Sequence, residues 1–241
     1  MRWRSIVKAP MSAGLRTAIR NVAEEIRIQR WHRRSIRKAA SMARYPIKLN
    51  LGAGERPRRG SGWVNIDLTP GADLQLDLRE PFPFPNESVT EIYAEHFLEH
   101  LSLPNLDDSA AWDLETNERR SPALSLLREC RRVLVPGGIL DIVVPDAEGI
   151  VSEYIRRRHT DGVASIPPDW WGPRWCDTAM HRVNYMFRQG RQHLYLYDEQ
   201  TLASLLKSLN FTDVRRRDFD RQKDAANHEI GSLCMIAIKP S

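Results

Sequence analysis

The chain has 241 residues, of which 41% are hydrophobic and 28% charged, and its formal net charge is +5. This composition is ordinary for a soluble globular protein, and the length suits one α/β domain with decoration or two small domains. No apolar run approaches the roughly 20 residues of a membrane-spanning helix. The three cysteines are far apart and form no CxxC pair, so we expect a cytoplasmic protein without disulfides and without a metal site.

Positive charge is concentrated at the N-terminal end. Residues 1–44 contain twelve Lys and Arg against two Glu, a net +10, which leaves −5 for the rest of the +5 chain. Ile19, Val22 and Ile26 recur among the arginines at helical spacing. The residue before Pro46 disfavours the α conformation. The sequence therefore predicts a basic helical arm that ends before a separate domain.

The residues of this arm leave its partner open. Arg33, Arg34, Arg37 and Lys38 lie beside Trp31, a composition that suits anionic lipid. The same charges could pack on another protein, on the acidic body of this chain or on RNA phosphates, and a solvated helix is the plain alternative. We expect the arm to contact a membrane surface or a protein, which would place the chain at the inner membrane surface. We do not expect nucleic acid as the partner.

We divide the chain into an arm at 1–45 and a domain at 46–241, with a cap on the acceptor side at 146–198. Apolar runs predict seven strands, at 47–51, 63–68, 72–78, 89–94, 139–144, 212–218 and 232–238. Helices are predicted at 95–101, 123–134 and 198–209. This alternation favours a Rossmann-like α/β fold, a mostly parallel sheet with helices on both faces. The last two strands can pair antiparallel at one edge.

Small and acidic residues follow three successive predicted strands. Gly52, Ala53 and Gly54 follow the first, Asp67 ends the second, and Asp77 ends the third. Glycines let a backbone approach a ligand closely, and ligands of open α/β sheets bind beyond the carboxyl ends of the strands. One carboxylate there can accept hydrogen bonds from both ribose hydroxyls. Each of these residues alone could belong equally well to an ordinary turn or a helix cap. The prediction of a nucleoside site therefore depends on their occurrence after three successive strands.

The sequence resembles the class I S-adenosylmethionine (SAM)-dependent methyltransferases. The resemblance is carried by the segments LNLGAG, GWVNIDL, LQLDLREPFPFPNESVTEIYAEHFLEHL, LLRECRRVLVPGGILDIVVPD and LLKSLNFTDV, and it covers residues 47–145 and 193–239. It is strongest to bacterial predicted methyltransferases associated with surface polysaccharide. It implies that SAM is the cofactor and that a methyl group passes to an acceptor, such as a sugar or glycan intermediate.

The resemblance also implies cofactor contacts by position. Gly52 and Gly54 would face the methionine part of SAM, Asp67 would hold the ribose, and Asp77 with Leu78 would frame the adenine. The loop after the fourth strand would pass under the sulfonium. The expected cofactor contacts are Asn50, Gly52, Ala53, Gly54, Asp67, Leu68, Asp77, Leu78, Ala94 and Glu95. Too few residues follow Gly54 to form the long first helix of the family.

Methyl transfer is an in-line displacement at a carbon that positive sulfur already activates, so alignment can supply ~7–11 kcal/mol. A general base is needed only where the acceptor must lose a proton. His96 is the expected base because it follows the fourth strand and titrates near neutrality, although it could equally be a helix-start residue bonded to backbone. Glu95 could contact the cofactor ammonium or the acceptor, and His193 beside Tyr195 is a second candidate site.

The cap at 146–198 carries rings that could stack on a sugar or aromatic acceptor, or simply pack the cap. The rings are Trp170, Trp171, Trp175, His181, Tyr185, His193, Tyr195 and Tyr197.

Three rival functions fit parts of the sequence. The run His96-Phe97-Leu98-Glu99-His100 matches H-x-x-E-H, a zinc-protease pattern that needs both histidines on one helix. A nicotinamide dehydrogenase would need a third glycine where Pro57 stands. A non-catalytic adenosyl-binding scaffold would bind the cofactor without turnover.

Overall fold

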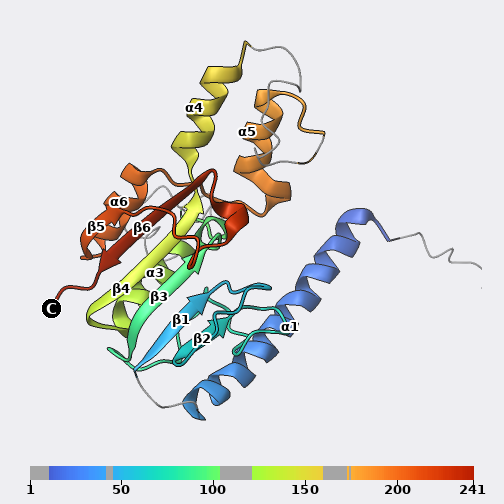
Figure 1. The fold of residues 1–241 in the computed structure, drawn as a ribbon. Helices are drawn as coiled ribbons and strands as arrows, with labels where there is room; N and C mark the ends of the chain where they lie inside the picture. The colour runs from blue at the N-terminus through green and yellow to red at the C-terminus, as the bar shows by residue number, and fades with distance from the viewer. Residues whose placement is uncertain (1–10, 42–45, 104–120, 160–172, 174) are drawn as a thin grey trace, which may run out of the picture.

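The described part of the chain forms a six-stranded mixed sheet with helices around it (Figure 1). The computed structural model describes residues 11–41, 46–103, 121–159, 173 and 175–241. The strands are β1 (Ile47–Leu51), β2 (Trp63–Ile66), β3 (Val89–Glu95), β4 (Leu134–Pro145), β5 (Thr212–Arg216) and β6 (Ser232–Ile238). Their order across the sheet is β2-β1-β3-β4-β6-β5.

Four neighbouring strands, β2, β1, β3 and β4, run parallel, whereas β6 is antiparallel to both β4 and β5. The predicted antiparallel pair at the edge is therefore confirmed. Central strands are buried on both faces, and this explains their continuous apolar runs; Leu49 and Val143, for example, are fully buried. The carboxyl ends of β1, β2 and β3 meet at one edge, which is where the predicted site residues lie.

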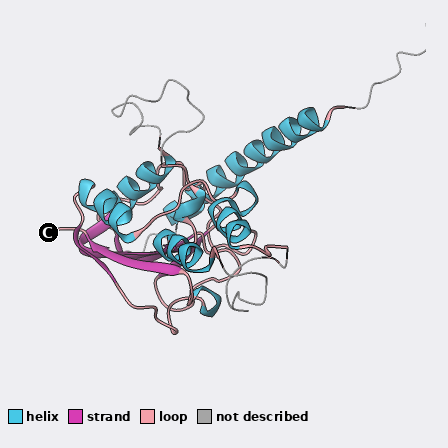
Figure 2. Ribbon diagram, turned by 90° about the horizontal axis from the view of Figure 1, so that it is seen from above, coloured by secondary structure: helices cyan, strands magenta, loops and turns pink. Residues whose placement is uncertain are grey.

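Helices begin where polar side chains cap them. Ser121 accepts a hydrogen bond from Leu124 N–H before α3, and Asp198 accepts one from Thr201 N–H before α6, so each cap satisfies an otherwise unpaired backbone donor. The described α-helices are α1 (Ala13–Ser41), α3 (Pro122–Val133), α4 (Ala147–Arg157), α5 (Ala179–Arg188) and α6 (Glu199–Ser208). Figure 2 shows how they surround the strands. The helices α3 and α6 contribute leucines to the main core.

The predicted strand at 72–78 does not form, so the prediction of seven strands is wrong. Only Leu74 makes a single bridge, to Ile66. The backbone N–H groups of Gln75 and Asp77 instead donate to side chains of α1, because this helix covers the segment where a neighbouring strand would pair. The alternating leucines of the segment are still buried, and this burial produced the strand-like pattern.

One further prediction needs correction. The expected helix at 95–101 is one short 3-10 turn, η1 (Leu98–His100). The cap at 146–198 contains α4, α5 and the 3-10 turn η3 (Gln189–Arg191). Trp170 and Trp171 in the cap lie outside the described residues.

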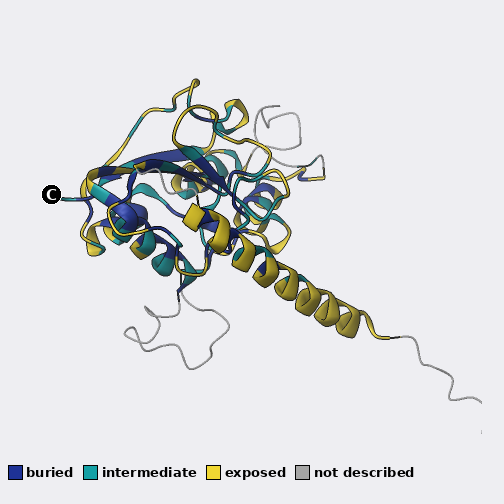
Figure 3. Ribbon diagram, turned by 90° about the horizontal axis from the view of Figure 1, so that it is seen from below, coloured by how far each residue is buried: buried dark blue, intermediate teal, exposed yellow. Residues whose placement is uncertain are grey.

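The predicted basic arm contains the helix α1, whose two halves differ in exposure. Its C-terminal half packs on the domain and buries Ile28, Ser35 and Ala39, and its N-terminal half extends away from the domain (Figures 1 and 3). Four apolar side chains on the extended half are between 46% and 61% exposed. Among the described helices, none has the length and apolar character to cross a membrane.

Candidate functional site

The loop after β1, residues 52–54, is called the glycine loop, and it requires glycine at its first position. Gly52 has a φ of +66°, and a Cβ atom built on it would lie 2.5 Å from Cδ2 of Phe97. A side chain at position 52 would therefore meet the aromatic ring and also strain the backbone. Gly54, with a φ of +50°, has no such neighbour, and its N–H donates to the carboxylate of Asp67 at 2.9 Å.

The two predicted acids lie at the same edge of the sheet but have different partners. Asp67 accepts from the N–H groups of Gly54 and Thr69, so it joins the end of β2 to the glycine loop. Asp77 is nearly buried and accepts hydrogen bonds from the backbone and the guanidinium of Arg79. Burial opposes ionisation of Asp77, but the hydrogen bonds from Arg79 outweigh it and lower the pKa of the carboxyl.

An apolar cavity of about 250 Å³ opens between these acids. It is lined by Asp67, Leu68, Leu76, Asp77, Leu78, Arg79, Phe97 and Leu101. Four of these residues, Asp67, Leu68, Asp77 and Leu78, were predicted as cofactor contacts from the sequence. Apolar walls with a few fixed polar groups are typical of a small-molecule site, and this cavity suits an adenine ring with its ribose.

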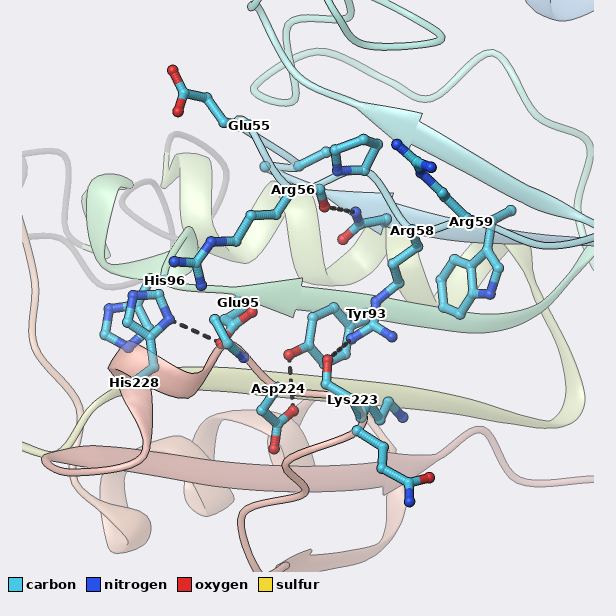
Figure 4. Close-up of a pocket in the computed structure, with 18 residues that line it drawn as sticks. Glu55, Arg56, Arg58, Arg59, Tyr93, Glu95, His96, Lys223, Asp224 and His228 are labelled. Carbon is cyan, nitrogen blue, oxygen red and sulfur yellow. Dashed lines mark hydrogen bonds and ion pairs between the residues drawn. The ribbon is translucent and has the colours of Figure 1, made fainter.

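A second cavity, of about 600 Å³, is lined by the glycine loop and by many charged side chains (Figure 4). Four cationic side chains line it, Arg56, Arg58, Arg59 and Lys223. Its other lining residues are Asn50, Gly52, Ala53, Gly54, Glu55, Pro57, Trp63, Tyr93, Glu95, His96, Gln222, Asp224, Ala225 and His228. The loop between β5 and β6, at residues 222–228, thus forms one wall.

Buried ion pairs hold this wall in place. Arg217 donates to Asp141 at 2.9 Å and to Asp224 at 2.6 Å, and both carboxylates are almost completely buried. The hydroxyl of Tyr93 donates to Asp224 at 2.8 Å. The guanidinium of Arg58 lies 3.5 Å from the centre of the Tyr93 ring, a cation–π contact that draws the glycine loop toward β3.

Glu95 is ionised and held by two donors. Its Oε1 accepts from the backbone N–H of Ala225 at 2.8 Å and pairs with Nδ1 of His228 at 2.9 Å (Figure 4). Burial would raise the pKa of this carboxyl, but the hydrogen bonds from His228 and Ala225 outweigh burial and lower it. Glu95 therefore presents a negative charge that is fixed between β3 and the 222–228 wall.

His96 lies deep in the same cavity. Its Nε2 bonds to the hydroxyl of Ser232 at 2.9 Å, and its ring stacks on His228 with centroids 3.7 Å apart. Burial, reinforced by repulsion from His228, lowers the pKa of His96 to about 2. The ring is therefore neutral at physiological pH and a weak base. Its φ of +49° is a strained conformation of a kind that occurs often at functional sites.

Three side chains near η1 form a separate group with metal-ligating chemistry. One ligand atom from each of Glu99, His100 and His193 lies within 4.8 Å of the others. Burial raises the pKa of Glu99 to about 8. The zinc-protease alternative required His96 and His100 on one helix, but the 3-10 turn η1 begins after His96, and the described group contains His193 in its place.

The structure brings most predicted site residues together, although not all of them. Asn50 lines the polar cavity while donating to Asn65, whereas Ala94 is buried in the core and lines neither described cavity. His193 also lies outside both cavities. In the cap, Trp175 makes edge contacts with His181 and Tyr185 and is 62% exposed, so these rings pack on one another.

Sequence reasoning missed several residues. Phe97 and Leu101 stand in the segment that carries the resemblance, and their spacing of four residues is a signal that they share a face. Arg79 directly follows the Asp77-Leu78 pair. No local pattern indicates His228, because it reaches His96 only through the pairing of distant strands.

Neither the protein-family models nor the curated proteins contain a match to this chain. A chain in the complex between the Haloferax volcanii Trm112 methyltransferase activator and a methyltransferase is 14% identical, with 91% of this chain and 96% of that chain covered and a TM-score of 0.44. A SAM-dependent methyltransferase from Archaeoglobus fulgidus is 14% identical, with 88% and 94% covered and a TM-score of 0.42.

Haemonchus contortus phosphoethanolamine N-methyltransferase 2 in complex with SAM is 12% identical, with 87% of this chain and 53% of that chain covered and a TM-score of 0.42. These structural neighbours are methyltransferases, but the likenesses are too distant to support an activity for this chain. The interpretation of the site therefore depends on its own geometry.

Proposed function

We propose that this chain is a SAM-dependent methyltransferase. The observation that carries the proposal is a pair of cavities, one apolar and bordered by Asp67 and Asp77, the other polar. Gly52–Gly54 lines the polar cavity and contacts Asp67 and Phe97 of the apolar one. A cofactor with an aromatic base at one end and a charged amino acid at the other matches this division. The glycine loop is where the sulfonium would lie.

The adenosyl group would occupy the apolar cavity. Asp67 would accept from the ribose hydroxyls, and Asp77 with Leu78 would frame the adenine, against the ring of Phe97. Three N–H groups of Arg79 already donate to the carboxylate of Asp77, from its backbone N, Nε and Nη2, and an ionised carboxylate has about four acceptor positions. It can therefore still receive the adenine amino group.

The methionine part would lie along the glycine loop, with Glu95 close to its ammonium. This loop, which includes Ala53, would be supported by the neighbouring residues Asn50 and Ala94. The neutral His96 would contact the acceptor, and its weak basicity suits a reaction in which alignment supplies most of the rate. His193, the second candidate, lines neither described cavity and has no part in this proposal.

The acceptor would enter the polar cavity. Lys223 is already paired with Glu91 and Asp141. The positive charge at this cavity therefore comes from Arg56, Arg58 and Arg59, and it favours an acceptor that carries phosphate or carboxylate groups. Nucleotide-sugars and charged glycan intermediates have this chemistry.

Calorimetric titration with SAM, and with its demethylated product, tests the cofactor site. Asp67→Ala should weaken binding roughly 10- to 100-fold, because hydrogen bonds to a charged acceptor are worth ~1.5–3 kcal/mol. Asp213→Ala, which removes an exposed carboxylate that pairs with Arg215, is the matched control and should bind like the wild type. Equal binding by both variants would reject the proposed site.

Turnover separates the enzyme from a non-catalytic scaffold. The wild type should transfer label from methyl-labelled SAM to one member of a panel of nucleotide-sugars and charged glycans. Tight SAM binding without transfer to any member would favour the scaffold.

We also propose that the extended half of α1 contacts an anionic membrane surface. The supporting observation is the exposed stripe of Leu15, Ile19, Val22 and Ile26, which stands among arginines on a helix and so combines apolar area with positive charge. The wild type should sediment together with anionic vesicles, whereas the double variant Ile19→Glu/Val22→Glu should stay in the supernatant. Equal sedimentation of both proteins would exclude this contact, and would favour a protein partner for the arm.

A further inference from the structure

The buried carboxylate of Glu99 has no partner that explains its burial. The residue is 0% exposed, and neither carboxylate oxygen has a hydrogen-bond partner in the described part of the chain. Taking a carboxylate out of water without a compensating partner is very costly. Nδ1 of His96 lies 3.5 Å from Oε1, but no hydrogen bond forms between them. The geometry around Glu99 is therefore suited to a cation.

Two histidines beside Glu99 are oriented as metal ligands usually are. Nδ1 of His100 lies 3.0 Å from the carbonyl of Gln192, and Nδ1 of His193 bonds to the carbonyl of Met186. Because a carbonyl can only accept, each Nδ1 must carry the proton, and this leaves the lone pair on Nε2. A second hydrogen bond of this kind fixes the tautomer and the ring orientation of metal-bound histidines.

The backbone holds the two contributing segments together. The N–H groups of Leu194 and Tyr195 both donate to the carbonyl of Glu99, at 2.8 and 3.2 Å. His193, which directly precedes these donors, is therefore held beside η1. One ligand atom from each of the three side chains already lies within 4.8 Å of the others. Ligands about 2.0–2.2 Å from one ion are closer together than that, so small side-chain rotations would complete the site.

We propose that Glu99, His100 and His193 bind one divalent transition-metal ion. Two imidazoles and one carboxylate favour zinc and cobalt over magnesium or calcium, which prefer oxygen ligands alone. Three protein ligands leave a further position for water or for a ligand oxygen. The site is independent of the proposed SAM pocket, because none of its three residues lines either described cavity.

Metal binding by the wild type is the first test. Full-length protein without a histidine tag is stripped with a chelator and titrated with Co²⁺, whose visible absorption reports coordination, and then with Zn²⁺. We expect one cobalt ion per chain, displaced by zinc, and a higher melting temperature in the loaded protein. Absence of a saturable cobalt signal would overturn the proposal.

Single substitutions then test the ligands. His193→Ala, His100→Ala and Glu99→Gln should each weaken cobalt binding at least about tenfold. His181→Ala is the matched control, because it removes an exposed imidazole that pairs with Asp177, and it should bind like the wild type. His100 is the least buried of the three ligands, so His100→Ala should disturb the fold least. If the other variants fail to fold, His100→Ala provides the test. Wild-type affinity in folded His100→Ala would overturn the proposal, whatever the protein's affinity for SAM.

Discussion

The two cavities have opposite chemistry, although one short segment, residues 95–101, lines part of both. Glu95 and His96 line the polar cavity, whereas Phe97 and Leu101 line the apolar one. The apolar cavity is formed by residues 67–101, close together in sequence. The polar cavity joins the β1 loop to residues 222–228, far along the chain. The apolar cavity therefore depends on local sequence and the polar cavity on long-range packing, and this difference can be tested.

The largest expected effect comes from removing the ion pairs behind the polar cavity. Arg217→Met leaves two buried carboxylates, Asp141 and Asp224, without their shared guanidinium. Breaking a buried pair in this way costs about 3–5 kcal/mol, which should appear as a lower urea midpoint. The matched variant Arg215→Met loses only an exposed pair, with Asp213, worth about 1 kcal/mol at most.

The same variant tests whether the cavities are separable. At low temperature, where enough Arg217→Met protein stays folded, SAM affinity should remain close to that of the wild type, because the apolar cavity is intact. Loss of SAM affinity in proportion to the loss of stability would show that the two cavities form one unit.

The second effect acts on the glycine loop. Gly52→Ala should cost about 1–3 kcal/mol more in unfolding free energy than Gly190→Ala, because crowding against Phe97 adds to the strain. The two glycines have nearly the same φ, +66° and +67°, but a Cβ on Gly190 meets no atom within 4 Å. The double variant Gly52→Ala/Phe97→Ala should recover most of this difference. Equal losses from both single variants would mean that the Phe97 contact is unimportant.

The contrast between the cavities also explains how much could be predicted from sequence. The strands β1, β3, β4 and β6 were predictable because strands buried in the middle of a sheet are continuous apolar runs. The glycines after β1 and the acid after β2 predicted a site at the carboxyl ends of these strands, and Asp67 lines the apolar cavity there. Leu74, Leu76 and Leu78 have the alternation of a strand, but the N–H groups between them bond to His32 and Ser35 of α1. Which partner covers a segment is a tertiary property that no local pattern reveals.

Long-range contacts limited the prediction of the polar cavity. His96 was identified as a base from its position after β3, but its low pKa results from burial and from the stacked ring of His228. The same holds for the metal-ligating group, in which His193 reaches Glu99 through backbone bonds across a large sequence separation. The pattern H-x-x-E-H contains two of the three residues, Glu99 and His100, but its other histidine is His96 and not His193.

A third, smaller effect should separate the cavities by ligand. Phe97→Ala removes the ring that faces the apolar cavity and should weaken SAM binding about three- to tenfold, because an aromatic contact is worth ~0.5–1.5 kcal/mol. Arg59→Ala removes a charge from the polar cavity and should leave SAM affinity unchanged while raising KM for an anionic acceptor. The check is calorimetry for SAM combined with initial rates for the acceptor. Equal weakening of SAM binding by both variants would contradict the division of roles.

The smallest effect concerns the acid stability of the polar cavity. Hydrogen bonds from His228 and Ala225 hold the pKa of Glu95 below its ordinary 4.5 in the folded chain. A carboxyl with a lowered folded pKa stabilises the fold above its unfolded pKa, and this contribution is lost as the pH falls through the folded value. Glu95→Gln should therefore unfold more easily than the wild type at neutral pH, by about 1 kcal/mol.

The difference between Glu95→Gln and the wild type should shrink below about pH 4.5, because the wild-type carboxyl then becomes neutral as well. Urea midpoints measured from pH 7 down to about pH 3 would follow this convergence. Glu148→Gln, on the exposed first turn of α4, is the control and should be close to the wild type at every pH. A gap that stays constant as the pH falls would mean that the charge of Glu95 does not stabilise the 222–228 wall, and that shape alone holds this side of the cavity.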